Sequence, residues 1–223
     1  SIEEMLDTCM MLSTFGKGKQ PKGANIVMTT FGGGSGVLAT DLCSMLDLNV
    51  PNLSKPTESK LQKLLTPLAS IKNPIDLTPQ SINDPHWREL LPEALKLILE
   101  DKNIDMFMFM AGGMGHRKQE LLAIISALNK CKKPLAVSWM APPSGLRAQL
   151  ADMGVFLFEE HARAVRTLAT IAKMSLAKEK PIRIARRKTI DFDWGPFQAA
   201  KQKLFSEDSV ATMMDTAKLN FAK

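Results

Sequence analysis

The residues best suited to chemistry in this sequence are four glycines, placed where an apolar segment gives way to a helical pattern. Residues 24–41 read ANIVMTTFGGGSGVLATD. The glycines are Gly32, Gly33, Gly34 and Gly36. A strand, a glycine-rich turn and a helix N-terminus in this order present unpaired backbone N–H groups, and the positive end of a helix dipole, to an anion. The chemistry predicted here is therefore the binding of a phosphate group.

Two interpretations of this turn stay open on spacing alone. In the first, the N–H groups of Gly33 to Gly36 and the helical turn as far as Val37 bind the anion, assisted by the hydroxyl of Thr30 or Ser35. In the second, the glycines only allow a strand and a helix to pack closely. Two better-known phosphate motifs are excluded, because G-x-G-x-x-G does not fit and no Lys-Ser/Thr pair follows as in a Walker A loop.

The three histidines are weaker candidates. His116 stands beside Arg117 at a predicted helix start, where a phosphorylated or general-base histidine would lie close to the helix dipole. That dipole would lower the pKa of the imidazole, and we interpret His116 as an exposed residue. His86 and His161 also occupy predicted helix starts, and we interpret both as surface residues.

The remaining polar candidates have structural explanations. Asp76, in NPIDLTP, is interpreted as a turn-forming carboxylate, with orientation of a partner loop as the alternative. Cys43 and Cys131 lie in predicted helical segments without an adjacent base, so we expect core thiols. The spacing of histidines and cysteines predicts no metal site.

Alternating strands and helices must position these residues. Apolar runs predict strands at 24–31, 73–77, 105–111, 134–140 and 155–158. Helical patterns cover 35–48, 56–65, 84–100, 144–153 and 160–176, and another helix follows the glycines at 112–115. This order with short connections predicts an α/β fold, a flavodoxin-like doubly wound parallel sheet of about five strands in three αβα layers.

Ligands of such sheets bind at the carboxyl ends of the strands. The Gly32–Gly36 turn is expected at that edge. Candidates for a supporting role at the same edge are Asn73, Asp76, Gly112 and Gly113.

Length and composition limit the possibilities further. The 223 residues carry a formal charge of +6, and residues 183–188 contribute basic side chains without aromatic interleaving, so we expect a solvated segment rather than a nucleic-acid site. Three widely spaced cysteines favour a reducing cytoplasm, and no stretch has the length of a membrane span. We expect a helix and linker at 1–23, the main domain at 24–177, and a connector with a short helix at 178–223. A first residue other than Met suggests a piece of a longer protein.

Several segments together resemble the NDP-forming acyl-CoA synthetases, relatives of succinyl-CoA synthetase. The family pattern combines a TNGGG-PGVLA-AD-like turn with a later NPVDLT. Here the corresponding segments are TTFGGGSGVLATD and NPIDLTP, followed by DMFMFMAGG, KPLAVSWM and LADMGVFLFEEHARAVRTLATI. The resemblance covers roughly residues 1–177 and is carried by the segments in combination.

The resemblance implies a ligase-CoA domain of an enzyme that interconverts carboxylate, CoA and NTP with acyl-CoA, NDP and phosphate, through acyl phosphate and a phosphohistidine. The glycine turn would face that phosphohistidine, which a separate domain supplies. CoA, ATP or GDP/ADP, and Mg would bind other domains of the parent, namely its CoA-binding, phosphohistidine and ATP-grasp domains. We expect no tightly bound cofactor and no catalytic side chain in this chain.

The sequence also departs from the family. Phe31 replaces the usual Asn before the glycines, and Ser35 replaces a Pro. The alternative hypothesis is a non-catalytic flavodoxin-like binding or scaffold module. We expect neither nucleic acid nor membrane as a partner, and the sequence leaves a homo-oligomer open.

Overall fold

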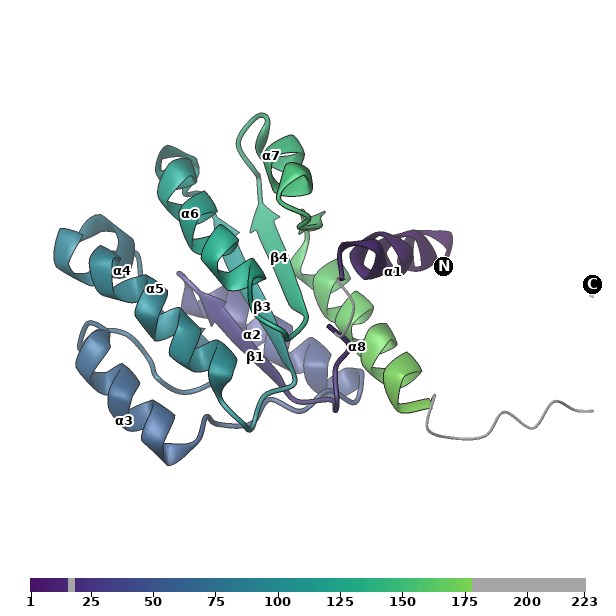
Figure 1. Cartoon of the computed structure of the whole chain (residues 1–223), viewed down its shortest axis with the longest axis horizontal. Coiled ribbons are helices and arrows are strands. Elements are labelled where there is room, and N and C mark those ends of the chain that lie inside the picture. Colours follow the sequence, from purple (N-terminus) through teal and green to yellow (C-terminus); the bar gives the residue numbers. More distant parts are fainter. Residues whose placement is uncertain (16–18, 178–223) are drawn as a thin grey trace, which may run out of the picture. The chain divides into compact units, whose positions relative to one another are not determined.

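The fold is built on a five-stranded parallel sheet, which confirms the predicted α/β architecture. The computed structural model describes residues 1–15 and 19–177. The strand order is β2-β1-β3-β4-β5, and every pair is parallel (Figure 1). The strands are β1 (Ile26–Thr30), β2 (Ile75–Asp76), β3 (Met106–Gly112), β4 (Leu135–Met140) and β5 (Leu157–Phe158).

Helices connect the strands and cover both faces of the sheet. The helices predicted within residues 1–15 and 19–177 all form, and a short helix not predicted from the sequence, α4, precedes α5. The predicted connector at 179–205 and helix at 206–219 lie outside the described residues. The helices are α1 (Ile2–Thr14), α2 (Gly33–Met45), α3 (Lys55–Leu64), α4 (Gln80–Asn83), α5 (Pro85–Glu100), the 3-10 helix η1 (Gly115–Arg117), α6 (Lys118–Asn129), α7 (Leu146–Asp152) and α8 (His161–Ala177).

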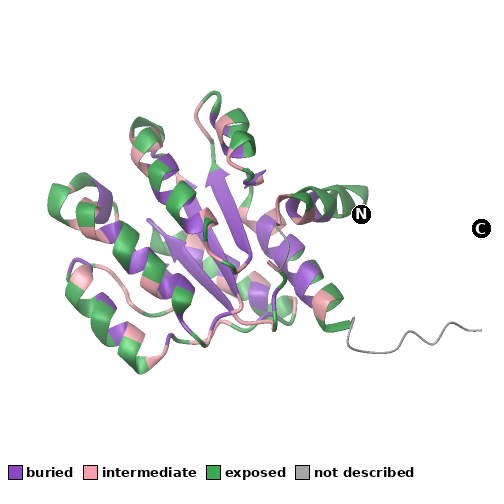
Figure 2. Ribbon diagram, in the orientation of Figure 1, coloured by how far each residue is buried: buried purple, intermediate pink, exposed green. Residues whose placement is uncertain are grey.

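The central strand β3 separates two hydrophobic cores by its alternating side chains. Phe107 and Phe109 join the core under α3, α5, α6 and α7. Met108 and its neighbours Met106 and Met110 join the core under α1, α2 and α8. Because successive side chains of a strand point to opposite faces, the run MFMFM packs both layers, and most of the sheet is buried (Figure 2). Met140, at the end of β4, is exposed.

Local capping signals explain where several helices begin. Asp84 accepts a hydrogen bond from the backbone N–H of His86 at the start of α5, as Asp before Pro85 predicts. Ser54 is the N-cap residue of α3, but its side chain makes no capping bond. The Ser54 hydroxyl donates instead to Asp101 Oδ2 at 2.6 Å, because this buried carboxylate is the stronger acceptor.

Most large apolar residues of α2 do not face the core, although Leu42 packs against it. α2 buries Gly36, Ala39 and Cys43, whereas Val37 and Leu38 are 61% and 73% exposed. A narrow face of small residues lets the helix lie close to its neighbours.

The first helix, α1, also exposes several of its large apolar residues. α1 buries Asp7, Thr8 and Met11 against the rest of the domain. Its exposed large apolar residues are Ile2, Met5, Leu6 and Met10. Monomeric domains rarely expose such apolar stripes on two helices, so both faces are candidates for contacts with other protein surfaces.

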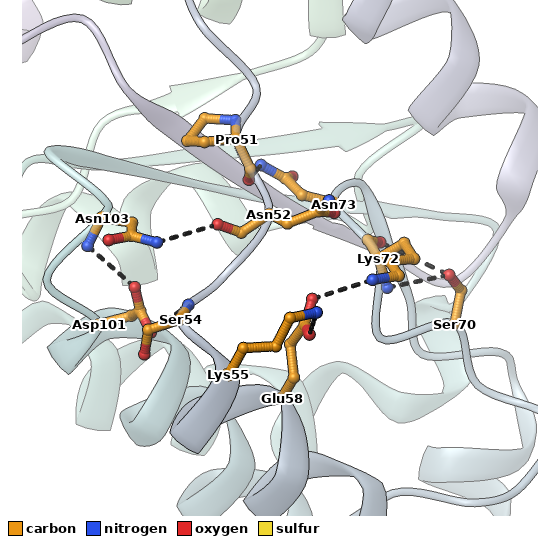
Figure 3. Close-up of polar contacts among 10 residues, drawn as sticks. All are labelled: Pro51, Asn52, Ser54, Lys55, Glu58, Ser70, Lys72, Asn73, Asp101 and Asn103. Carbon is orange, nitrogen blue, oxygen red and sulfur yellow. Dashed lines mark hydrogen bonds and ion pairs between the residues drawn. The ribbon is translucent and has the colours of Figure 1, made fainter.

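Polar side chains complete the sheet edge beside β1. The Asn73 amide accepts from the backbone N–H of Met28 and donates to the carbonyl group of Ile26. It also donates to the carbonyl group of Pro51 (Figure 3). It takes the place of a neighbouring strand along this part of β1. Nearby, Glu58 is buried and forms ion pairs with Lys55 and Lys72 at 2.8 and 3.1 Å.

Candidate functional site

The glycine turn forms the start of α2, two residues earlier than the sequence pattern suggested. Gly32 is the N-cap, with extended backbone, and the helix begins at Gly33. The N–H groups of Gly33 and Gly34 lie in the first turn, where no earlier helical carbonyl is available to accept from them. Ser35 is less free, because its N–H donates to the Gly32 carbonyl at 3.2 Å.

Thr30 has an internal role in this turn. Its hydroxyl accepts from the backbone N–H of Gly32 and lies 3.1 Å from the Gly32 carbonyl oxygen. These contacts fix the last residue of β1 relative to the helix start. The Thr30 hydroxyl therefore shapes the turn, and the N–H groups of Gly33 and Gly34 are the donors best placed for an anion.

The four glycines divide between the two interpretations of the turn. A Cβ atom at Gly36 would lie 3.0 Å from Pro74 Cβ, so close packing requires this glycine. A Cβ atom at Gly32 or Gly34 would meet nothing within 4 Å. Gly36 thus serves packing, while open space surrounds the other two and leaves room for a ligand.

Asp76 lies close to Gly33 in this turn. Its Oδ1 accepts from the Thr78 N–H, as expected of a turn-forming carboxylate. Its Oδ2 would be 3.3 Å from a Cβ atom at Gly33. The carboxylate therefore adds negative charge beside Gly33, and an incoming anion is favoured on the side of Gly32 and Gly34.

A cavity of about 330 Å³ opens at the carboxyl ends of the strands, beside the start of α2. The cavity brings together the predicted site residues Thr30, Gly32, Ser35, Gly112 and Gly113. Gly33, Gly34, Gly36, Val37, Asn73 and Asp76 are not among its lining residues. Asn73 is engaged in the edge of β1, and Val37 faces outward on α2.

One of the two histidines interpreted from the sequence as surface residues lies in this cavity. His161 is half-buried, not a surface residue as we expected, and it lines the cavity as the first residue of α8. Its Nδ1 lies 2.7 Å from the hydroxyl oxygen of Ser138, which is fully buried on β4. Burial lowers the pKa of His161 and favours the neutral ring. Only the pairing of β4 with the start of α8 brings these residues together, so no local sequence signal marks them.

The other predicted candidates occupy the expected environments, with one exception. His116 is exposed at the cavity rim, and His86 is exposed and stacks on Trp87. Cys43 is a buried core thiol, and burial raises its pKa to about 12. Cys131 lies just beyond the end of α6 and not within a helix, packed against the core.

Two further properties hold for residues 1–15 and 19–177. No three histidine, cysteine or acidic side chains in these ranges gather as metal ligands would. None of the helices in these ranges combines the length and apolar character that crossing a membrane requires.

Curated proteins with similar sequences are ADP-forming CoA ligases. Acetate–CoA ligase II subunit alpha of Pyrococcus furiosus is 33% identical over 106 residues, which is 48% of this chain and 21% of that protein. The 4-hydroxybutyrate–CoA ligase of Nitrosopumilus maritimus is 25% identical over 193 residues, which is 84% of this chain and 26% of that protein. The chain thus spans about a quarter or less of the curated relatives it matches. No protein-family model matches the sequence.

Solved structures share the fold. A protein of Pyrococcus horikoshii OT3 superposes with a TM-score of 0.66 at 24% identity, covering 82% of this chain and 41% of that one. Acetyl-coenzyme A synthetase 1 of Candidatus Korarchaeum cryptofilum, in complex with phosphate and ADP, gives a TM-score of 0.65 at 19% identity. That match covers 80% of this chain and 38% of the synthetase chain.

Proposed function

We propose that this chain, which is related to part of the ADP-forming acyl-CoA ligases, is the domain of such an enzyme that helps stabilise a phosphohistidine. Another domain of the parent protein supplies that histidine. The observation that carries the proposal is the start of α2, where the N–H groups of Gly33 and Gly34 lie in the first turn beside a cavity and a Cβ atom at Gly34 would meet nothing within 4 Å. The parent reaction joins a carboxylate to CoA while NTP is converted to NDP and phosphate.

The contribution of this domain is electrostatic. A phosphoryl group at the start of α2 interacts with the partial positive charge of a 13-residue helix and with its free N–H donors. Such donors are preorganised, so they need no rearrangement when charge develops during phosphoryl transfer. No proton-transfer group of this chain is required for the step.

The exposed apolar residues of α2 support a contact with a neighbouring domain. Val37 and Leu38 follow the glycine turn directly and are more than half exposed. A domain that brings a phosphohistidine to the turn would cover this face and exclude water from the site. Exclusion of water strengthens the interaction between the helix start and the phosphoryl group.

Other domains of the parent would bind CoA, ATP or GDP/ADP, and Mg. They correspond to the CoA-binding, phosphohistidine and ATP-grasp domains that the family resemblance implies. The names of the relatives specify acetate and 4-hydroxybutyrate as acyl groups in those enzymes.

The sharpest test is Gly34→Val in the full-length parent enzyme. The new side chain meets no protein atom within 4 Å of its Cβ, so the fold should be retained while the anion space is filled. We expect phosphoenzyme formation from labelled NTP to fall by about tenfold or more, because a preorganised donor site is blocked. Ser44→Val, at an exposed position late in the same helix, is the matched control and should leave phosphoenzyme unchanged. Equal phosphoenzyme levels in the wild type and Gly34→Val would overturn the proposal.

The domain contact has its own test. Leu38→Lys should leave the free energy of unfolding of this chain within about 0.5 kcal/mol of the wild type, since the side chain is exposed. In the parent enzyme the same change should lower phosphoenzyme formation, because a charge would enter the contact. Full activity of that variant would remove this support for a covered α2 face.

The cavity is also compatible with a second function, that of a non-catalytic binding or scaffold module. Its volume of about 330 Å³ is at the small end for ligand sites. Native mass spectrometry of the purified chain distinguishes the two functions. A co-purifying flavin would favour the binding module and contradict the ligase assignment.

A further inference from the structure

The Ser138 hydroxyl is buried and therefore needs a hydrogen-bond partner within the protein. It lies on strand β4, fully buried, and within the described residues its hydrogen-bonding partner is Nδ1 of His161 at 2.7 Å. A buried hydroxyl hydrogen without an acceptor costs roughly 1–3 kcal/mol. The lowest-cost arrangement therefore has Ser138 donating its hydrogen to an unprotonated Nδ1.

This arrangement determines the chemistry of the other ring nitrogen. In a neutral imidazole only one nitrogen carries a hydrogen, and the hydrogen bond at one nitrogen determines which. With Nδ1 accepting from Ser138, the hydrogen must sit on Nε2. The described residues supply no hydrogen-bond partner for Nε2, and His161 lines the cavity beside the start of α2.

We propose that His161 is a phosphoryl-binding residue of this cavity and that Ser138 is its positioning residue. Ser138 holds the neutral ring with its hydrogen on Nε2, and Nε2–H donates to an oxygen of the phosphoryl group at the start of α2. The inference rests on the proposed function, since it concerns the same phosphoryl group. It adds a second donor, from α8, to the backbone donors of α2.

The surroundings of the cavity favour an anion over other ligands. Its lining combines apolar walls such as Phe31, Met114 and Met140 with the residues at the starts of α2 and α8. No carboxylate is among the lining residues. Two helices of 13 and 17 residues begin at this cavity, so the positive ends of both dipoles act on a ligand there. The lowered pKa of His161, caused by burial, agrees with a neutral ring that donates from Nε2.

The tautomer can be measured on the full chain without any ligand. Long-range ¹H–¹⁵N spectra of the imidazole rings should show Nε2 of His161 as the protonated nitrogen. In Ser138→Ala the constraint is lost, and His161 should show a mixture of both tautomers. A wild-type ring with its hydrogen on Nδ1 would overturn the proposal, as would a Ser138→Ala variant that keeps the hydrogen wholly on Nε2.

Phosphate binding tests the ligand. Inorganic phosphate, titrated against chloride at equal ionic strength, should shift the backbone amide signals of Gly33 and Gly34 and the ring signals of His161. His161→Ala should weaken binding about tenfold, as expected for loss of one hydrogen bond to a charged group. His161→Gln retains an N–H donor and should bind within a few-fold of the wild type. His86→Ala, an exposed histidine outside the cavity, is the matched control and should bind normally.

The outcomes separate this inference from the proposed function. Unchanged phosphate affinity in His161→Ala, or no phosphate-dependent shift at His161 in the wild type, overturns the inference. In the parent enzyme, loss of phosphoenzyme in Gly34→Val but not in His161→Ala would leave the proposed function intact and remove His161 from the site. Loss in His161→Ala alone would instead remove the glycine turn.

Discussion

The buried carboxylate of Asp101 links two segments of the chain that are distant in the sequence. It accepts hydrogen bonds from the Ser54 backbone N–H and hydroxyl and from the Asn103 N–H. Burial raises the pKa of Asp101, but these hydrogen bonds outweigh it, so the net pKa lies below the ordinary 3.8. The carboxylate thereby joins the start of α3 to the segment that leads into β3.

We predict that Asp101→Asn lowers the free energy of unfolding at neutral pH by about 1.5–3 kcal/mol, because hydrogen bonds to a charged acceptor are replaced by weaker ones. The pKa is lower in the folded than in the unfolded state. The stabilisation is therefore present above pH 3.8 and is lost as the pH falls through the folded pKa. Urea unfolding at several pH values should show the difference between the two proteins shrinking in acid.

Asp152→Asn provides the comparison for Asp101, because Asp152 is an exposed aspartate on α7. Its substitution should change stability by less than about 0.5 kcal/mol. A pH-independent difference between wild type and Asp101→Asn would refute the stabilising role of the charged form.

The cysteines give a second prediction at the scale of single residues. Cys43 is fully buried and burial raises its pKa to about 12, whereas Cys9 is exposed on α1. The thiolate is the reactive form, so an alkylating reagent at about pH 8 should modify Cys9 rapidly and leave Cys43 intact. Peptide mass spectrometry distinguishes the sites. Modification of Cys43 in the folded protein at the rate of Cys9 would contradict the packing of α2.

At the scale of elements, the start of α2 shows that glycines of one motif can have different surroundings. Gly36 lies against Pro74, whereas Gly34 borders open space. The sequence motif does not distinguish these two glycines. Their different surroundings depend on Pro74, which is 38 residues distant from Gly36 in the chain. The need for close packing is a property of the fold, not of the motif.

We expect opposite effects from alanine at these two glycines. Gly34→Ala should stabilise the chain by about 0.5–1 kcal/mol, because alanine loses less backbone entropy in a helix and meets no clash. Gly36→Ala should destabilise it, because the new Cβ lies 3.0 Å from a rigid ring atom. Thermal unfolding of both variants provides the measurement, and a more stable Gly36→Ala variant would show that α2 can move away from Pro74.

Much of the element pattern was predictable because its signals are local. Asp84 before Pro85 marks the start of α5, and the run from Met106 to Ala111 marks a buried strand by composition alone. The outward apolar faces of α1 and α2 were not predictable, since periodicity indicates a helix but not which side packs. The pairing of His161 with Ser138 was missed because it joins residues 23 positions apart across the sheet edge.

For the molecule as a whole, the doubly wound parallel sheet followed from the alternation of strands and helices with short connections. The attachment of α1 did not follow from it. Arg163 on α8 donates to both carboxylate oxygens of Asp7 at 2.7 and 2.8 Å and also pairs with Glu3 at 3.0 Å. This contact holds the first helix on the domain through charge as well as through Met11.

We predict that Arg163→Ala releases α1 without unfolding the sheet. Removing the guanidinium leaves the Asp7 carboxylate, only 5% exposed, without its partner, at a cost of about 1–3 kcal/mol. Hydrogen exchange should rise across residues 2–14 and stay unchanged in β3 and β4. Arg166→Ala, at an exposed position on the same helix, should leave exchange in α1 as it is in the wild type. Uniform acceleration across the domain would show that α1 is part of its cooperative core.

The Asn73 amide beside β1 has a consequence for self-association. Both outer strands, β2 and β5, are two residues long, and the exposed side of β1 before β2 is occupied by the Asn73 amide and by a backbone bridge between Asn25 and Asn49. A foreign strand needs a row of unpaired backbone groups to extend a sheet. Within residues 1–15 and 19–177, this side of β1 offers almost none, which protects it from edge-to-edge pairing. A protein surface that binds the domain here would therefore do so through helix faces such as that of α2, and not by adding a strand beside β1.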